Sequence, residues 1–179
     1  MNVSLVMMIM GDDRPGLVNE LSTVIAENGG NWLESRMARL GGHFAGILRV
    51  QLPAEQEPKV LAALEALRAQ GLAVHAHKDL AGAAATAPRT LAVIEVVGQD
   101  RPGIIRQISQ VLAQQQVNVE ELDTHCDSAP MSGEMLFRAT ASVQLPDSCT
   151  LGQLQQALEH IAADLMVDIV VVPGEAHPH

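Results

Sequence analysis

The strongest constraint on the fold of this chain is an internal duplication. The tetrapeptide Asp13-Arg14-Pro15-Gly16 recurs as Asp100-Arg101-Pro102-Gly103, and the apolar pattern that follows it recurs in register. Chance does not reproduce both a tetrapeptide and five in-register apolar positions, so we interpret the chain as two copies of one folding unit. The matched apolar positions are Leu17, Val18, Leu21, Val24 and Ile25 in the first copy and Ile104, Ile105, Ile108, Val111 and Leu112 in the second.

The duplication also sets the expected domain boundaries. We predict a first domain over residues 1–80, a linker over 81–89, a second domain over 90–173 and a flexible tail over 174–179. The linker is rich in small residues and ends near a proline, which disfavours a helix just before it. The second copy is roughly six residues longer before its Gln-Leu-Pro tripeptide, and we place the extra residues in the polar stretch 127–132.

Each copy shows the element order strand, helix, strand, strand, helix, strand. This order predicts an α+β fold of two ferredoxin-like βαββαβ domains, each an antiparallel four-stranded sheet with two helices on one face. In the first copy, we expect strands at 3–10, 31–40, 43–52 and 72–77, a helix with Pro15 in its first turn that stops at Asn28, and a helix at 53–70. In the second copy, we expect strands at 91–97, 117–125, 134–145 and 165–172, and helices at 102–115 and 151–162.

The composition argues against several classes of function. The net charge is −10, whereas nucleic-acid binding needs a basic surface. Aromatic residues make up 2% of the chain, too few for a base-stacking sheet. The two cysteines form no disulfide framework or metal motif, and no apolar run reaches the ~18 residues of a membrane span. We interpret the apolar N-terminus as a buried strand and expect a cytoplasmic protein that does not bind membranes.

The corner between the first strand and the first helix of each copy is the strongest candidate site. A helix N-terminus presents free N–H groups that can bind a carboxylate. Gly16 and Gly103 would let a ligand approach the backbone, the aspartate could bind an ammonium group, and the arginine could bind a carboxylate. The alternative is a plain turn, in which proline starts the helix, aspartate caps it and arginine is solvated.

Asn31 and Asn118 open the second strand of each copy. Each could support a turn or point its amide at the corner, and the sequence does not decide between these interpretations. The corners are themselves unequal, because Asp12 aligns with Gln99. We therefore expect only one corner to bind a ligand and favour the first.

Neither the histidines nor the cysteines indicate a metal or catalytic site. His75 and His77 share one face of a strand, but no third ligand stands at a convincing spacing. His125 and Cys126 are adjacent in a strand and should point to opposite faces. We therefore predict no cofactor, no metal and no enzymatic activity.

A βαββαβ unit whose first corner reads Asp-Arg-Pro-Gly, with Asn opening the next strand, resembles the ACT domain. The resemblance covers about residues 3–172, and the tandem, free-standing arrangement resembles ACT-domain repressors of glycine cleavage genes. It implies a regulatory module that binds a small amino acid, glycine being favoured, at an interface between domains. The ligand-binding residues that it implies are Asp13, Arg14, Pro15, Gly16, Leu17, Asn31, Asp100, Arg101, Pro102, Gly103, Ile104 and Asn118.

The resemblance also implies a mechanism. Such a protein represses transcription by restraining an activator protein and does not contact DNA, and a homodimer is one assembly that it could form. The alternative is an amino-acid-binding regulatory subunit of a metabolic enzyme. The sequence does not identify the amino acid, the number of sites, the protein partner or the role of the longer connection in the second copy.

Overall fold

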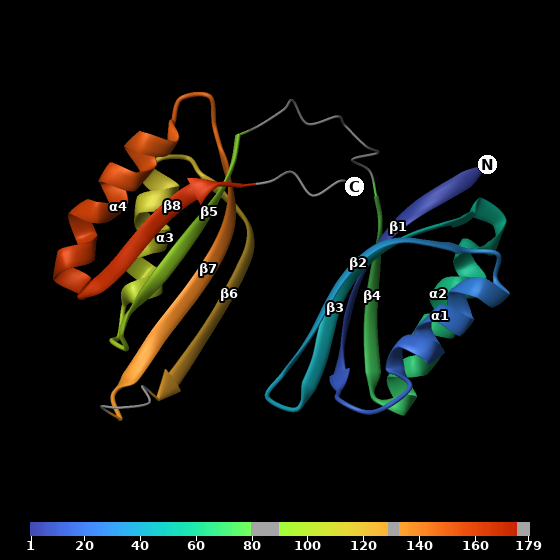
Figure 1. The fold of residues 1–179 in the computed structure, drawn as a ribbon. Helices are drawn as coiled ribbons and strands as arrows, with labels where there is room; N and C mark the ends of the chain where they lie inside the picture. The colour runs from blue at the N-terminus through green and yellow to red at the C-terminus, as the bar shows by residue number, and fades with distance from the viewer. Residues whose placement is uncertain (80–89, 129–132, 175–179) are drawn as a thin grey trace. The chain divides into compact units, whose positions relative to one another are not determined.

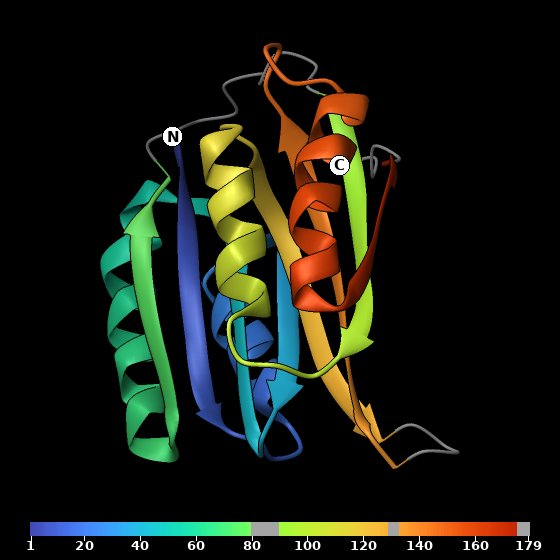
Figure 2. The ribbon, with the colours of Figure 1, turned by 90° about the vertical axis from the view of Figure 1, so that its left-hand side faces the viewer.

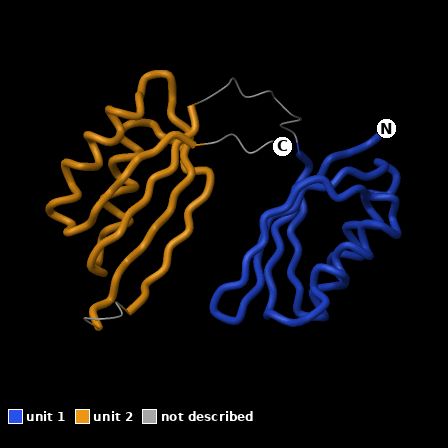
Figure 3. Tube along the Cα trace, viewed as in Figure 1, with its two compact units in different colours: residues 1–84 blue, residues 85–179 orange. Residues whose placement is uncertain are grey.

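A computed structural model describes residues 1–79, 90–128 and 133–174 of the chain (Figure 1). The chain divides into two compact units, Met1–Ala84 and Ala85–His179 (Figure 3). The predicted linker, 81–89, lies outside the described residues, and so does all of the predicted tail except Gly174. Residues 129–132 of the stretch 127–132, in which we place the extra residues of the second copy, also lie outside them.

The two units have the same order of elements. The first contains β1 (Asn2–Asp12), α1 (Leu17–Glu27), β2 (Asn31–Leu40), β3 (His43–Pro53), α2 (Glu57–Leu67) and β4 (Leu72–Lys78), with short 3₁₀ turns at Ala54–Gln56 and Arg68–Gln70. The second contains β5 (Thr90–Gln99), α3 (Ile104–Gln114), β6 (Asn118–Ser128), β7 (Met135–Leu145), α4 (Leu151–Leu165) and β8 (Val167–Pro173).

Each unit is one antiparallel sheet with two helices on one face (Figures 1 and 2). The strand orders are β2-β3-β1-β4 and β6-β7-β5-β8, which confirms the predicted ferredoxin-like fold. The Gly41-Gly42 turn between β2 and β3 has positive φ angles of 58° and 82°, as a tight hairpin requires. The edge strands β2 and β6 each carry a bulge at the same position of the repeat, after Trp32 and after Val119.

The cores lie between each sheet and its helices. In the first unit, alternate residues of β1, Leu5, Met7 and Ile9, are buried against Leu21 and Ile25 of α1. Two members of the predicted apolar stripes do not join this core: Val18 is 46% exposed and Leu61 is 38% exposed.

Several predicted helix boundaries were wrong. The helix predicted at 53–70 is α2, Glu57–Leu67, because Pro53 ends β3 and 3₁₀ turns flank α2 on both sides. Pro15 lies before α1, which begins at Leu17, and Pro102 likewise precedes α3. Leu165, predicted to start the last strand, ends α4 instead. Both early helices begin later than predicted because Gly16 and Gly103 adopt left-handed conformations that end the preceding turn.

At the end of the first strand of each unit, the backbone lies very close to that of the residue before the last strand. A Cβ atom on Gly11 would lie 2.4 Å from the carbonyl oxygen of Gly71, and one on Gly98 would lie 2.5 Å from that of Met166. Gly71 and Met166 are equivalent residues that turn the chain into β4 and β8 with φ of 87° and 54°. Glycine is therefore required at the end of β1 and β5 to let the neighbouring strand pair.

Candidate functional site

The two candidate corners share one backbone conformation. Gly16 and Gly103 precede their helices with φ angles of 96° and 95°. The amide of Asp13 donates to the carbonyl of Gly42, and that of Asp100 donates to the carbonyl of Met135, each at 2.9 Å. Among the described residues, no side chain caps either helix, so the interpretation of the aspartates as caps was wrong. Only side chains distinguish the corners.

In the first corner, both predicted charges are neutralised within the unit. Arg14 forms a bidentate pair with Glu20 in the first turn of α1, with N···O distances of 2.5 and 2.7 Å. Arg39 of β2 pairs with Asp13 at 2.6 Å between Nε and Oδ2. The hydrogen bonds from Arg14 lower the pKa of Glu20, so this pair persists at neutral pH and is lost only as the pH falls through that lowered value. The interpretation of Arg14 as solvated was wrong.

In the second corner, neither of these pairs can form. Gln107 stands at the position of Glu20 in the repeat, and Cys126 stands at that of Arg39. Arg101 donates to the neutral amide oxygen of Gln99 at 3.1 Å. Cys126 lies close enough to Asp100 for that carboxylate to raise the pKa of the thiol. Within the described part of the chain, no carboxylate lies within 4 Å of the Arg101 guanidinium and no cationic group lies within 4 Å of Asp100.

Sequence reasoning missed Glu20, Arg39, Gln107 and Cys126. The signal was present, because the same repeat offset that aligned the apolar residues also aligns Glu20 with Gln107 and Arg39 with Cys126. Strand pairing supports the second alignment: Arg39 lies opposite Phe44, and Cys126 lies opposite Phe137.

The contact with Asp100 also affects the chemistry of Cys126. Loss of hydration raises the pKa of this thiol most, followed by the charge of Asp100, the hydrogen bond to Asp100 and the charge of Asp127. An elevated pKa keeps the sulfur protonated at neutral pH, and the protonated thiol is a poor nucleophile.

We expect Cys126 to react slowly with iodoacetamide at pH 8 although its side chain is exposed. Replacing Asp100 with asparagine removes a negative charge that disfavours the thiolate, so Asp100→Asn should accelerate alkylation several-fold. Peptide mass spectrometry separates Cys126 from the buried Cys149, which serves as an internal control. Equal rates in the parent and Asp100→Asn would contradict the contact.

Asn31 and Asn118 do not lie beside the corner of their own unit. Asn31 pairs with Gln51 at the start of β1, whereas the corner follows the end of β1, where Asp12 pairs with His43. Gln51 also pairs with Ser4, so eight residues of β1 separate the two places, roughly 27 Å at about 3.4 Å per residue. The second unit has the same arrangement, and there the Asn118 amide donates to Glu120.

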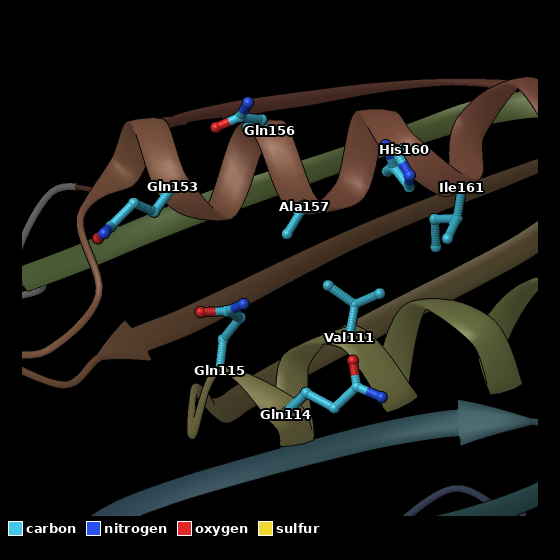
Figure 4. Close-up of a pocket in the computed structure, with 8 residues that line it drawn as sticks. All are labelled: Val111, Gln114, Gln115, Gln153, Gln156, Ala157, His160 and Ile161. Carbon is cyan, nitrogen blue, oxygen red and sulfur yellow. The ribbon is translucent and has the colours of Figure 1, made fainter.

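Three of the pockets formed by the described residues are lined by residues outside the Asp-Arg-Pro-Gly corners. One of about 520 Å³ lies between α3 and α4 and is lined by four glutamines, His160 and an apolar floor that includes Val111 (Figure 4). One of about 260 Å³ lies on the helix-free face of the first sheet, beside Arg49 and Asp79. The third, about 380 Å³, lies beside the first corner against Gly11 and His43. None of these three pockets is lined by Asp13, Arg14, Asp100 or Arg101.

His75, His77 and His125 lie on the strand faces that the alternation of side chains predicts. His75 and His77 are exposed, opposite Met8 and Val6 of β1. His125 lies between Asp123 and Asp127, at 3.8 and 3.3 Å, while Cys126 points to the opposite side of β6. The described residues contain no group of three or more histidine, cysteine, aspartate or glutamate side chains that could hold a metal ion, and no helix among them is long and apolar enough to span a membrane.

Two ferredoxin-like units with the same Asp-Arg-Pro-Gly corner place the chain in the class of tandem α+β proteins. The ACT-domain family models match residues 4–77 and 92–147, and the chain belongs to the ACT-domain family. Among curated proteins, it is 35% identical over 86 residues to a UPF0237 protein of Methanopyrus kandleri, an alignment that covers 46% of this chain and 86% of the relative.

Solved structures match the whole chain. A protein of unknown function from Galdieria sulphuraria is 30% identical with a TM-score of 0.86, and the match covers 98% of this chain and 100% of that one. A proposed glycine cleavage system transcriptional repressor is 22% identical with a TM-score of 0.68, covering 97% and 99%. The second similarity shows a shared tandem fold.

Proposed function

We propose that this chain is a non-enzymatic, amino-acid-responsive regulator whose ligand binds at a strand–helix corner of an ACT domain. The observation that carries the proposal is the retention of one corner, with the same backbone geometry, in two ACT domains of one chain. The ligand-binding residues that we propose are Asp13, Arg14, Pro15, Gly16, Leu17, Asn31, Asp100, Arg101, Pro102, Gly103, Ile104 and Asn118.

The corner and the asparagine of one unit lie too far apart to contact the same small ligand. Within one unit, roughly 27 Å of strand separates Asn31 from its corner, which is farther than an asparagine side chain can reach. We therefore propose that Asn31 and Asn118 contact a ligand other than the one at the corner of their own unit. This agrees with the binding of amino acids at domain–domain interfaces that the ACT resemblance implies.

We further propose that the chain represses glycine cleavage genes by binding a transcriptional activator, and that glycine changes its affinity for that activator. The tandem fold shared with a proposed glycine cleavage repressor supports this assignment. Regulation then follows from linkage, since glycine can change partner binding only by binding the free and partner-bound states unequally.

The proposed function is tested by capture of the activator. Tagged protein should retain one transcriptional activator from an extract of its native cell, identified by mass spectrometry, and glycine should change the amount retained. L-glutamate, which is larger and carries an extra negative charge, is the control. Retention of the same activator at equal levels with and without glycine would reject the response to glycine, and capture of a metabolic enzyme would favour the regulatory-subunit alternative.

We expect the purified protein not to shift duplex DNA that carries the regulated promoter at physiological salt. The net charge of −10 provides little of the counterion release that drives such binding. An electrophoretic mobility assay with the activator as positive control checks this. A salt-dependent complex of this protein alone, tighter than the roughly micromolar range of non-specific binding, would contradict the proposed mechanism.

A further inference from the structure

The helix-free face of the first sheet brings two histidines and a methionine together. His75 and His77 alternate along β4, so both imidazoles lie on this face. The sequence offered no third ligand beside them, but β1 pairs with β4 (Figure 2), and this pairing places Met8 directly opposite His75. We propose that His75, His77 and Met8 form a binding site for monovalent copper, Cu(I).

Strand geometry places these three side chains within reach of one ion. Residues directly opposite each other in an antiparallel pair have Cβ atoms about 4.5–5.5 Å apart, and diagonal neighbours are about 7–8 Å apart. Met8 is directly opposite His75 and diagonal to His77, and the two histidines are two residues, roughly 7 Å, apart along β4. Met10 lies on the same face but is four residues, roughly 14 Å, from the position opposite His77. An ion held by both histidines therefore reaches Met8 and not Met10.

The three side chains are available to a ligand. Met8 is 46% exposed, although methionine is a residue that usually fills cores. Both histidines are exposed, and among the described residues neither imidazole takes part in a hydrogen bond or an ion pair. Arg49, a cation on the same face, is paired with Asp79 at 3.2 Å, so its charge is compensated.

The chemistry of the three donors selects the ion. A thioether is a neutral, soft donor, and among the metals of proteins it favours Cu(I). Imidazole binds copper, zinc, nickel and iron, each through a neutral ring nitrogen. Copper in its monovalent state is therefore the ion that both kinds of donor favour, and a set of two imidazoles and one thioether holds it without a carboxylate.

The second unit shows that the fold does not require these residues. The strands β5 and β8 pair as β1 and β4 do, and at the equivalent positions Glu95, Val170 and Val172 stand in place of the methionine and the two histidines. The same sheet face is thus built without any of the three donors. The first unit alone combines them, so the site is a property of that unit and not of the ferredoxin-like sheet.

The Cu(I) affinity of the purified protein tests the proposal. It is measured under nitrogen by competition with the chromogenic chelator bicinchoninate, and every protein carries Cys126→Ser because an exposed thiol also binds Cu(I). Loss of an outer-shell partner alone weakens metal binding by about tenfold or more, so loss of a ligand should weaken it at least as much. We expect Met8→Leu, His75→Gln and His77→Gln each to lower the affinity of the tightest site by about tenfold or more.

Met10→Leu is the matched control, because it is the same substitution on the same face of the same strand, and it should leave the affinity unchanged. Silver(I), a diamagnetic ion with the same preference for soft donors, gives a second readout. In protein labelled at the methionine methyl groups, one equivalent should shift the NMR signal of Met8 and not that of Met10. Thermal melts verify that each variant is folded. Equal affinities for the parent and Met8→Leu, or equal losses in Met8→Leu and Met10→Leu, would overturn the proposal.

Discussion

Replacing Gly98 with alanine is expected to destabilise the second unit by about 1–3 kcal/mol, the typical range of overpacked sites. The added Cβ would lie 2.5 Å from the Met166 carbonyl oxygen and 2.7 Å from the Val167 Cα. Both are backbone atoms, so the clash cannot be relieved by rotation of a side chain, and β8 must move away from β5. Urea unfolding followed by circular dichroism measures the loss.

Gly152→Ala is the matched control in the same unit. Gly152 lies in the first turn of α4, and a Cβ there would meet no atom within 4 Å. Alanine should therefore raise stability by up to about 1 kcal/mol through helix propensity. If Gly98→Ala and Gly152→Ala unfold at the same urea concentration, the close approach of β8 to Gly98 is not a constraint on the fold.

The fold could be predicted because it depends on patterns that the chain contains twice. The buried strand β1, the Gly41-Gly42 hairpin and the element order each follow from local sequence, and the duplication confirms each by repetition. The close approach of the Gly71 carbonyl group to Gly11 could not be predicted, because nothing around Gly11 indicates which residue of the neighbouring strand lies beside it. That information resides in the strand pairing.

The chemistry of the candidate site could be predicted only in part. The Asp-Arg-Pro-Gly motif identified the corners, but the partner of Asp13 comes from Arg39, a strand away. A motif search does not reach across a sheet, so the contact of Arg39 with Asp13 emerged only from the position of β2 in the sheet. The distance from Asn31 to the corner likewise depends on strand direction, which a motif does not specify.

The buried stripe of α2 is narrower than the apolar pattern of the sequence predicts. A period of 3.6 residues groups Leu61 with Val60 and Leu64, but the sheet covers only the centre of that stripe. Leu64 is 2% exposed, whereas Leu61, at the margin, remains 38% exposed. Identical residue types therefore make very different contributions to stability within one turn of α2.

We expect Leu64→Ala to cost about 2–4 kcal/mol, because it leaves a cavity between α2 and the sheet. Leu61→Ala should cost less than about 1 kcal/mol, as surface substitutions do. Trp32 is the only tryptophan of the chain and packs against the core of the first unit, so its fluorescence reports unfolding of the unit that contains both leucines.

The comparison of the two leucines is internally controlled, since both substitutions remove the same atoms from the same helix and change helix propensity equally. With a urea dependence of about 1–3 kcal/mol per molar, the midpoint for Leu64→Ala should fall by about 1 M or more relative to that for Leu61→Ala. Equal midpoints would mean that α2 packs through a wider face than the burial of Leu64 indicates. The first unit would then have to be described with Leu61 in its core.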